Sequence, residues 1–302
     1  MCRGNIDNPH VSILMTVYNR SDYLRQAIES VIKSKYSSWE LIITDDCSTD
    51  NSYTIALEYQ MKDDRIRVYK NEHNLGDYPN RNKAASYAQG KYLKYLDADD
   101  LMYPHSLEIM VDSMEKFPEV AFAASQEVYE DYDPYPFVML PHETYYREFF
   151  KRGVLGFAPS ATIIRRDIFE SLGGFTGKRY VGDIEFWLKA AAVYPMLKLQ
   201  SGLVFWRRHE GQEFQLGTQN SSYLVFNYTC VTEALANIHC PLNSDEKKTA
   251  LKWIDFRHGR GIIHLALKKR LPWKAIMAIK ASSFSFLKVL KSFIPWSIYR
   301  KL

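Results

Sequence analysis

The amino-acid sequence predicts an α/β fold with a mainly parallel central sheet, followed by a helical extension. Short apolar runs that favour strands alternate with runs of helical spacing between residues 11 and 117, a pattern typical of parallel strands buried between helices. Acidic or polar residues directly follow three of these strands. From about residue 217 onward only helical spacing recurs. We therefore expect an α/β domain over residues 1–215 and a helical extension over 216–302.

Four strand and helix pairs make up the first part of this pattern. In the first pair, the apolar run 11–19 precedes a helix at 21–34, where Leu24, Ile28 and Val31 share one face behind a Ser-Asp start signal. The other three pairs follow the same rule. Their strands are expected at 39–48, 66–71 and 91–100, and their helices at 50–61, 79–90 and 105–117.

The pattern is less regular after Pro118. Residues 119–160 are rich in Pro, Tyr and acidic residues, which predicts a long loop that serves as a lid or binding segment. Three further segments are expected to be regular: a strand and helix at 160–175, a helix at 182–195, and a strand at 197–212 that leads into a basic, His-containing end.

Composition excludes several classes of protein. The content of 46% hydrophobic and 25% charged residues is typical of a folded, soluble protein, and a net charge of +4 over 302 residues does not indicate a nucleic-acid binder. The four cysteines form no CxxC pair, so neither zinc nor a disulfide framework is expected. No signal-like or membrane-spanning apolar run is present in the sequence. These features predict a cytoplasmic protein.

Carboxylates gather at the expected strand ends, where open α/β sheets bind their ligands. Asp97 and Asp99 are two residues apart, so an extended backbone places both side chains on one side, where they could face Mg²⁺ or Mn²⁺. The alternative is that Asp99 or Asp100 caps the following helix. The candidate residues at the three strand ends are Thr16 and Tyr18; Asp45 and Asp46; and Asp97, Asp99 and Asp100.

Four segments, in this order, resemble motifs of the family 2 glycosyltransferases: VSILMTVYNRSDYL, IITDDCSTDNS, NLGDYPNRNKA and YLDADDLMYP. The similarity covers roughly residues 10–210. MTVYN, GDIEFW and the following YP are especially similar to the bacterial spore-coat glycosyltransferase, whereas the C-terminal third is not. The resemblance implies a GT-A, Rossmann-like nucleotide-diphospho-sugar transferase domain that binds a nucleoside-diphosphate sugar, most often a UDP-sugar.

The resemblance also implies a role for each strand-end residue. Thr16 and Tyr18 would flank the base, and Asp46, with Asp45 beside it, would accept the uracil N–H. Asp97 would lie near the ribose and the metal ion. Asp99 would ligate the Mg²⁺ or Mn²⁺ that bridges the diphosphate. Cys47 stands where the family often has Gly, and we expect it to be inert.

Asp183, in VGDIEFW, matches the catalytic base of the family, which takes the proton of the acceptor hydroxyl. Gly182 replaces the Glu that commonly precedes this Asp, as it does in the spore-coat enzyme, so loss of activity does not follow. The alternative is that Asp183 only caps a helix, and both roles can coexist.

Basic residues at two places are candidates for the diphosphate. Arg207 and Arg208 match an Arg/His element that closes over the phosphates, with His209 as a further metal ligand or, alternatively, a surface residue. Arg81 is a second phosphate or nucleotide candidate, and its alternative is a solvated position at a helix start.

The predicted function is that of a metal-dependent, inverting hexosyl- or hexosaminyltransferase that builds cell-surface polysaccharide on a saccharide or lipid-linked acceptor. One alternative is a non-catalytic nucleotide-sugar or membrane-binding protein. The other is an Asp-based phosphotransferase, which is disfavoured because its DxD pair would more naturally end the first strand than the fourth. Nucleic acid is not an expected partner, because carboxylates repel phosphate unless a cation intervenes.

The C-terminal segment is basic and amphipathic. No Asp or Glu occurs from Phe256 to Leu302, and lysines and arginines alternate there with Leu, Ile, Phe and Trp. Helices of this composition bind anionic membrane surfaces, which predicts peripheral attachment at the inner face of the membrane. The alternative is that these helices pack on the catalytic domain and expose their lysines to solvent.

Overall fold

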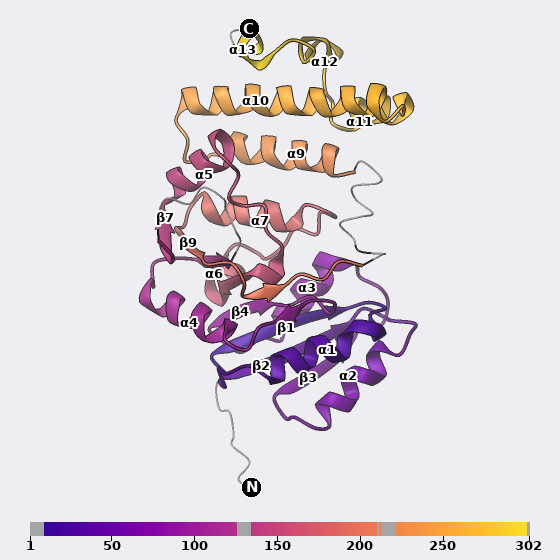
Figure 1. Ribbon diagram of the computed structural model, residues 1–302, viewed down its shortest axis with the longest axis vertical. Coiled ribbons are helices and arrows are strands. Elements are labelled where there is room, and N and C mark those ends of the chain that lie inside the picture. The colour runs from indigo at the N-terminus through magenta and orange to yellow at the C-terminus, as the bar shows by residue number, and fades with distance from the viewer. Residues whose placement is uncertain (1–8, 126–133, 210–211, 213–221, 301–302) are drawn as a thin grey trace.

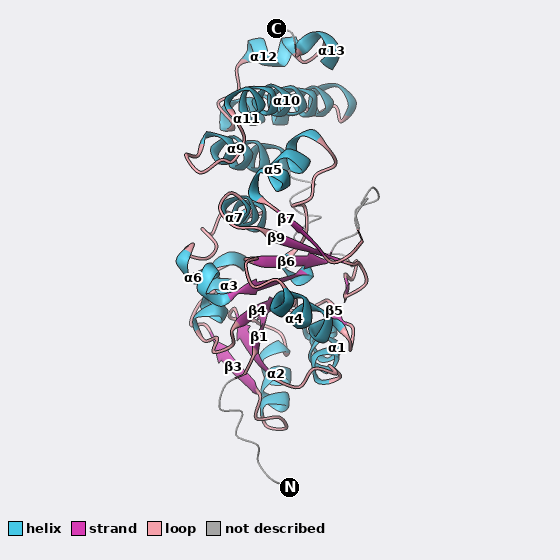
Figure 2. Cartoon of the chain, turned by 90° about the vertical axis from the view of Figure 1, so that its left-hand side faces the viewer, coloured by secondary structure: helices cyan, strands magenta, loops and turns pink. Residues whose placement is uncertain are grey.

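The computed structural model describes residues 9–125, 134–209, 212 and 222–300. An eight-stranded sheet in the order β3-β2-β1-β4-β8-β6-β9-β7 forms its centre. Helices cover both faces (Figures 1 and 2), because α1, α2 and α4 pack in one buried cluster and α3, α6 and α7 in the other. The predicted α/β class is confirmed.

The strands of the large sheet are short, and a small second sheet lies beside it. The second sheet pairs β5 with β10 in antiparallel fashion. The strand bounds are β1 Val11–Val17, β2 Trp39–Asp45, β3 Ile66–Lys70, β4 Tyr92–Tyr95, β5 Leu101–Met102, β6 Phe122–Ser125, β7 Phe137–Met139, β8 Thr162–Arg165, β9 Met196–Leu199 and β10 Val204–Phe205.

Helices connect these strands and continue alone after β10. Their bounds are α1 Ser21–Ile32, α2 Ser52–Gln60, α3 Asp77–Ser86, α4 Ser106–Lys116, α5 Pro141–Phe150, α6 Arg166–Ser171, α7 Gly182–Ala191, α9 Ser222–Ala236, α10 Ser244–Ile263, α11 Pro272–Ala281, α12 Phe286–Lys291 and α13 Trp296–Tyr299. A short 3-10 turn, η1, covers Pro159–Ala161, and a π-helical turn, η2, covers His264–Lys268.

The register of the parallel strands fixes where polar side chains meet. β1 pairs in parallel with β2, so that Val17 lies level with Asp45, and with β4, so that Leu14 lies level with Tyr95. Both faces of β1 are buried: Ile13 and Met15 pack into one cluster and Leu14 into the other. The residues that follow β1, β2 and β4 are therefore brought to one edge of the sheet.

Two expectations from the sequence are wrong. The segment 119–160 is not one long loop, because its described part contains β6, β7 and α5; β6 and β7 have only four and three residues, too few to show a period. The strand expected at 197–212 ends at Leu199, and a turn with Gly202 at φ 83° redirects the chain into β10.

The C-terminal helices lie at the end of the molecule away from β1, β2 and β3 (Figure 1). Leu235 of α9 and Ala250 of α10 belong to the same buried cluster as Trp187 of α7. A smaller cluster joins η2, α11 and α12 through Leu265, Ala278, Val289 and their neighbours. The domain boundary at residue 215 stays a prediction. Within the described ranges, no helix is both long enough and apolar enough to cross a bilayer.

Candidate active site

Asp99 is the centre of a charged cluster beyond the carboxyl end of β4. Its Oδ2 atom lies 2.9 Å from Arg20 Nε and 2.9 Å from His209 Nε2. The three side chains come from the ends of β1, β4 and β10, and Asp99 itself is only 9% exposed. The structure thus brings together the two residues that the sequence nominated as metal ligands, and it adds Arg20, which the sequence analysis did not single out.

Asp99 and His209 are the described side chains that could take part in binding a divalent cation. A carboxylate oxygen and an imidazole nitrogen converge there. The carboxylate is a ligand type that Mg²⁺ or Mn²⁺ takes together with phosphate oxygens and water, although in this conformation the same oxygen is paired with Arg20. Among the described residues, no group of three His, Cys, Asp or Glu side chains forms a closed metal site. Ligands from the substrate would have to complete the coordination shell.

Asp97 has a different partner. Arg81 of α3 is buried and lies between two carboxylates, with Nε 2.8 Å from Asp77 Oδ1 and Nη2 2.7 Å from Asp97 Oδ1. The alternative, a solvated position at a helix start, is therefore wrong for Arg81. In this conformation the guanidinium joins α3 to the end of β4, and a contact with the nucleotide stays a prediction.

Asp100 is not a helix cap, contrary to one expectation. The helix that follows, α4, begins at Ser106 with His105 as its N-cap residue. Asp100 is instead buried, and its Oδ1 atom accepts a hydrogen bond from the backbone N–H of Arg207 at 3.1 Å. Burial, and then the negative charge of Asp97, raise the pKa of Asp100 well above its ordinary value. The residue ties the β10 segment to the β4 end.

Asp46 organises the loop before α3. Its carboxylate accepts hydrogen bonds from Asn71 Nδ2 at 2.8 Å and from the backbone N–H groups of Leu75 and Gly76 at 2.8 and 2.9 Å. A carboxylate has about four lone-pair sites, so one more donor can be accepted. The predicted contact with uracil is compatible with this geometry but stays a prediction.

The other predicted base-binding residues differ in exposure. Asp45 is fully buried, and its Oδ1 atom accepts from the Ser48 N–H at 3.0 Å. Thr16 is partly buried within β1, and Tyr18, just past the strand, is exposed. Cys47 has a φ of 64°, the left-handed region that favours glycine, so a glycine would fit this position without backbone strain.

Asp183 lies in the first turn of α7, which begins at Gly182 with Val181 as its N-cap residue. The cap alternative is therefore wrong in its strict form, although Asp183 Oδ1 accepts from the Ile184 N–H at 2.8 Å. The same oxygen accepts from the hydroxyl of Tyr78 at 3.0 Å. Burial raises the pKa of Asp183 to about 6, although these two hydrogen bonds act in the opposite direction.

The basic segment after β10 lies against the start of α1. Arg207 Nε donates to the backbone oxygen of Asp99 at 2.8 Å, and its Nη2 donates to Gln26 at 2.7 Å. His209 packs on the ring of Tyr23, with ring centroids 4.4 Å apart. Arg208 is exposed and lies over the ring of Trp206. This segment therefore covers the Asp99 cluster from one side.

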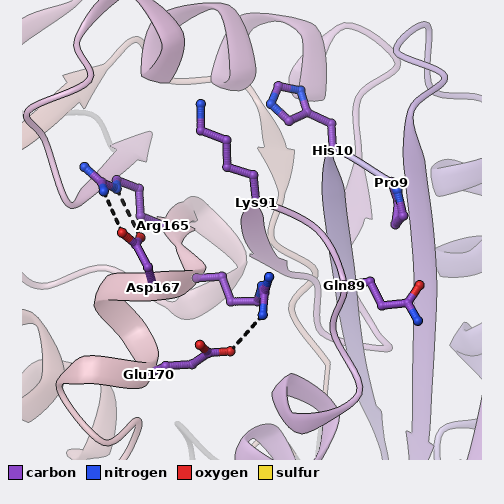
Figure 3. A pocket seen from close by; sticks show the side chains of 8 residues that line it. Pro9, His10, Gln89, Lys91, Arg165, Asp167 and Glu170 are labelled. Carbon is purple, nitrogen blue, oxygen red and sulfur yellow. Dashed lines mark hydrogen bonds and ion pairs between the residues drawn. The ribbon is translucent and has the colours of Figure 1, made fainter. Parts of the chain in front are cut away.

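A cavity of about 500 Å³ lies elsewhere, at the amino-terminal side of the parallel strands (Figure 3). His10 and Lys91 line it just before β1 and β4. Its basic groups already pair with acids, as Arg165 does with Asp167 at 2.6 Å. This cavity is therefore distinct from the Asp99 cluster, because it lies at the other end of the strands and its basic side chains are already in ion pairs.

The mainly parallel sheet, with acidic residues at its strand ends and a carboxylate in the first turn of α7, has the architecture of a glycosyltransferase domain of the GT-A type. The family model described as glycosyl transferase family 2 matches residues 12–173. The chain belongs to this family, as the sequence motifs predicted.

Two relatives illustrate the similarity. TuaG of Bacillus subtilis (strain 168), named for teichuronic acid biosynthesis, is 35% identical over 150 residues, which are 49% of this chain and 60% of TuaG. The UDP-Glc:alpha-D-GlcNAc-diphosphoundecaprenol beta-1,3-glucosyltransferase WfgD of Escherichia coli is 38% identical over 111 residues, which are 37% and 43% of the two chains. The chain thus matches less than two thirds of the length of either relative.

Solved structures share the fold over nearly the whole chain. Residues 1–349 of Staphylococcus aureus TarS in complex with UDP-GlcNAc superpose with a TM-score of 0.68 at 18% identity, covering 96% of this chain and 89% of that one. The mannosyltransferase PcManGT of Pyrobaculum calidifontis, in complex with GDP-Man and Mn²⁺, gives 0.61 at 16% identity, with coverage of 97% and 83%. At these identities the comparison shows the fold alone.

Proposed function

We propose that this glycosyltransferase transfers a hexosyl or hexosaminyl group, with inversion, from a UDP-sugar to a saccharide or lipid-linked acceptor during cell-surface polysaccharide synthesis. The observation that carries the proposal is the convergence of Asp99 and His209 at the carboxyl end of β4. Two similar proteins support this choice of donor and acceptor. WfgD is named as a transferase that uses UDP-Glc and a diphosphoundecaprenol-linked acceptor, and the structural neighbour TarS was solved in complex with UDP-GlcNAc.

Asp99 and His209 would hold Mg²⁺ or Mn²⁺, with Asp97 nearby. When bound, such an ion acts as a Lewis acid on phosphate oxygens and offsets the charge of the departing nucleotide. Arg207 and Arg208 extend the positive charge on the same side of the site. Thr16, Tyr18, Asp45 and Asp46 would form the base pocket, and Arg81 would act on the nucleotide side through Asp97.

Asp183 would be the catalytic base. A hydroxyl is a poor nucleophile until its proton is removed, and a carboxylate can accept that proton as the acceptor oxygen attacks the anomeric carbon. A single displacement of this kind inverts the anomeric configuration. A pKa of about 6 leaves Asp183 deprotonated at neutral pH while keeping it more basic than an ordinary carboxylate.

The test of the reaction measures nucleotide release from UDP-glucose, UDP-N-acetylglucosamine and GDP-mannose with Mn²⁺ or Mg²⁺. The acceptors are free N-acetylglucosamine and N-acetylglucosamine joined through a diphosphate to a lipid. We expect a UDP-sugar to be used, a product of inverted configuration by NMR, and a loss of acceptor-dependent turnover of at least about 100-fold in Asp183→Asn. Asp167→Asn, beside the distant cavity, is the control. If Asp183→Asn keeps its acceptor-dependent turnover, the assignment of Asp183 as the catalytic base is wrong.

The metal proposal has its own readout. Mn²⁺ binding in the presence of UDP, followed by electron paramagnetic resonance, should weaken by about tenfold or more in Asp99→Asn. Equal Mn²⁺ affinity in the two proteins, or turnover that is unchanged in EDTA, would contradict it. If UDP and Mn²⁺ bind but no sugar is transferred, the non-catalytic alternative would be supported.

We also propose that α11 and α12 attach the enzyme to an anionic membrane surface on the cytoplasmic side. Both helices bury small or medium side chains and expose large ones: Ala275 and Ala278 of α11 are buried, whereas Trp273, Ile276 and Met277 are more than half exposed. Such apolar faces, beside lysines and arginines with no acidic residue nearby in the sequence, match the surface of a negatively charged bilayer.

The second helix shows the same arrangement. In and just after α12, Phe286, Leu287 and Phe293 are more than half exposed while Val289 is buried. Co-sedimentation with vesicles of 70% phosphatidylcholine and 30% phosphatidylglycerol should be strong for the wild type. It should fall by about tenfold or more in Trp273→Ser/Phe286→Ser, since each large side chain contributes about 1.5–3 kcal/mol when buried. The control, Ile238→Ser, removes an exposed residue outside the basic segment. Equal binding by both variants would refute the attachment.

A further inference from the structure

Gly182, the residue before Asp183, lies directly against the ring of Tyr78. A β-carbon at position 182 would lie 2.8 Å from three atoms of that ring, closer than non-bonded carbons approach in proteins. Gly182 is not among the described glycines with a positive φ. The need for glycine at this position therefore comes from the neighbouring ring, and the backbone conformation does not impose it.

The ring of Tyr78 has little freedom to move away. It is only 6% exposed and packs on Phe175, with ring centroids 5.3 Å apart. The start of its helix is fixed by the hydrogen bonds that Asp46 accepts from Leu75 and Gly76. The hydroxyl of Tyr78 is thereby held 3.0 Å from Asp183 Oδ1.

The two oxygens of Asp183 have different surroundings. Oδ1 accepts hydrogen bonds from both Tyr78 and the Ile184 N–H. Among the described residues, none donates to Oδ2, and this is the oxygen that would take the proton of the acceptor hydroxyl in the proposed reaction. Burial, and then the charge of Asp183, raise the pKa of Tyr78 well above its ordinary value, so the hydroxyl keeps its proton and acts as the donor.

We propose that Tyr78 is the positioning residue for Asp183, and that Gly182 is present because any larger residue would displace Tyr78. The inference rests on the proposed role of Asp183 as the base. In this chain a tyrosine from α3 orients the carboxylate, at a place where the family more often has a Glu beside it.

The first test compares Tyr78→Phe with the wild type in acceptor-dependent nucleotide release. We expect kcat to fall roughly 10- to 100-fold with the donor KM unchanged, since a hydrogen bond to a charged group contributes about 1.5–3 kcal/mol. The apparent pKa of the acidic limb in the pH dependence of kcat should rise by about one unit. The lost hydrogen bond favoured the charged form of the Asp183 carboxylate. An unchanged rate and profile would overturn the proposal.

Tyr145→Phe is the matched control. Tyr145 is also buried and donates to the carbonyl of Leu188 at 2.8 Å, five residues beyond Asp183 on α7. Its loss should lower stability without moving the pH profile. If Tyr145→Phe moves the acidic limb as far as Tyr78→Phe does, the shift reflects general destabilisation and the positioning role is wrong.

The second test is a double-mutant cycle between positions 78 and 182. Gly182→Ala should displace the ring and reduce kcat by about as much as Tyr78→Phe, and the double variant should be little worse than either. Multiplicative losses would overturn the coupling. Asp183→Asn distinguishes failure of the proposed base from failure of the positioning role. If Asp183→Asn retains turnover, both the base assignment and the positioning role are wrong. If Asp183→Asn is inactive but Tyr78→Phe has the wild-type rate, only the positioning role is wrong.

Discussion

At the scale of single residues, two contacts of the site have no local signal in the sequence. Arg20 is 79 residues from Asp99, and Tyr78 is 105 residues from Asp183. The strand-end rule found Asp99 because it directly follows an apolar run. Arg20 lies one position beyond the expected run 11–19 and three beyond the end of β1 at Val17, so a search that extended three positions past each strand would have included it.

Asp183 gives a prediction about stability. Burial raises the pKa of this carboxyl from 3.8 to about 6 in the folded protein, so the charged form at pH 7 costs free energy of folding. Asp183→Asn should therefore raise the free energy of unfolding by about 1–2 kcal/mol at pH 7, while activity is lost.

The gain should disappear below about pH 4, where the carboxyl is protonated in the folded protein and increasingly so in the unfolded chain. Urea unfolding at pH 7.5 and pH 4 measures the difference, with the exposed Asp64→Asn as the control. A destabilised Asp183→Asn at pH 7.5, or a gain of equal size at both pH values, would contradict the pKa assignment.

At the scale of elements, α3 joins the two halves of the site. The loop before α3 donates a backbone hydrogen bond to Asp46. From the helix itself, Arg81 forms an ion pair with Asp97, and the hydroxyl of Tyr78 donates to Asp183. We expect Asp46→Asn to lower the free energy of unfolding by about 2–3 kcal/mol, because an amide N–H₂ would face a backbone donor. Urea midpoints measure this, with the exposed Asp64→Asn as the control. Equal midpoints for the two variants would show that Asp46 does not hold the loop.

The sequence predicted those strands and helices whose apolar pattern is visible within the element's own residues. Strands β1 and β2 are seven-residue strands, mostly apolar and almost wholly buried, and α1 has one apolar face, so period and burial agree. The strands β5 and β10 have two residues each and exist only because they pair with each other. Strand β7 is defined in the same way, by its antiparallel partner β9. No period can be detected in two or three residues.

At the scale of the whole molecule, a helix of the C-terminal extension shares a buried cluster with the central sheet. Leu235 of α9 is almost fully buried in the cluster that contains Leu14 and Trp187. We expect Leu235→Ala to destabilise the protein by about 2–5 kcal/mol. Hydrogen exchange should then speed up together in α9 and in β4.

Leu267→Ala, which truncates an exposed leucine of η2, is the control and should leave both rates unchanged. If Leu235→Ala accelerates exchange in α9 alone, the extension unfolds independently and the boundary expected at residue 215 marks a true domain.

The contact between Gly182 and Tyr78 also constrains how relatives of this chain can differ from it. A side chain at position 182 and an aromatic ring at position 78 require the same space, so position 182 can gain a side chain only if the residue at position 78 becomes smaller. Glycosyltransferases with Glu before the catalytic Asp should carry a smaller residue at the position of Tyr78. Those with Gly should be free to keep an aromatic one. The two positions are expected to evolve as a pair although they lie more than a hundred residues apart in the chain.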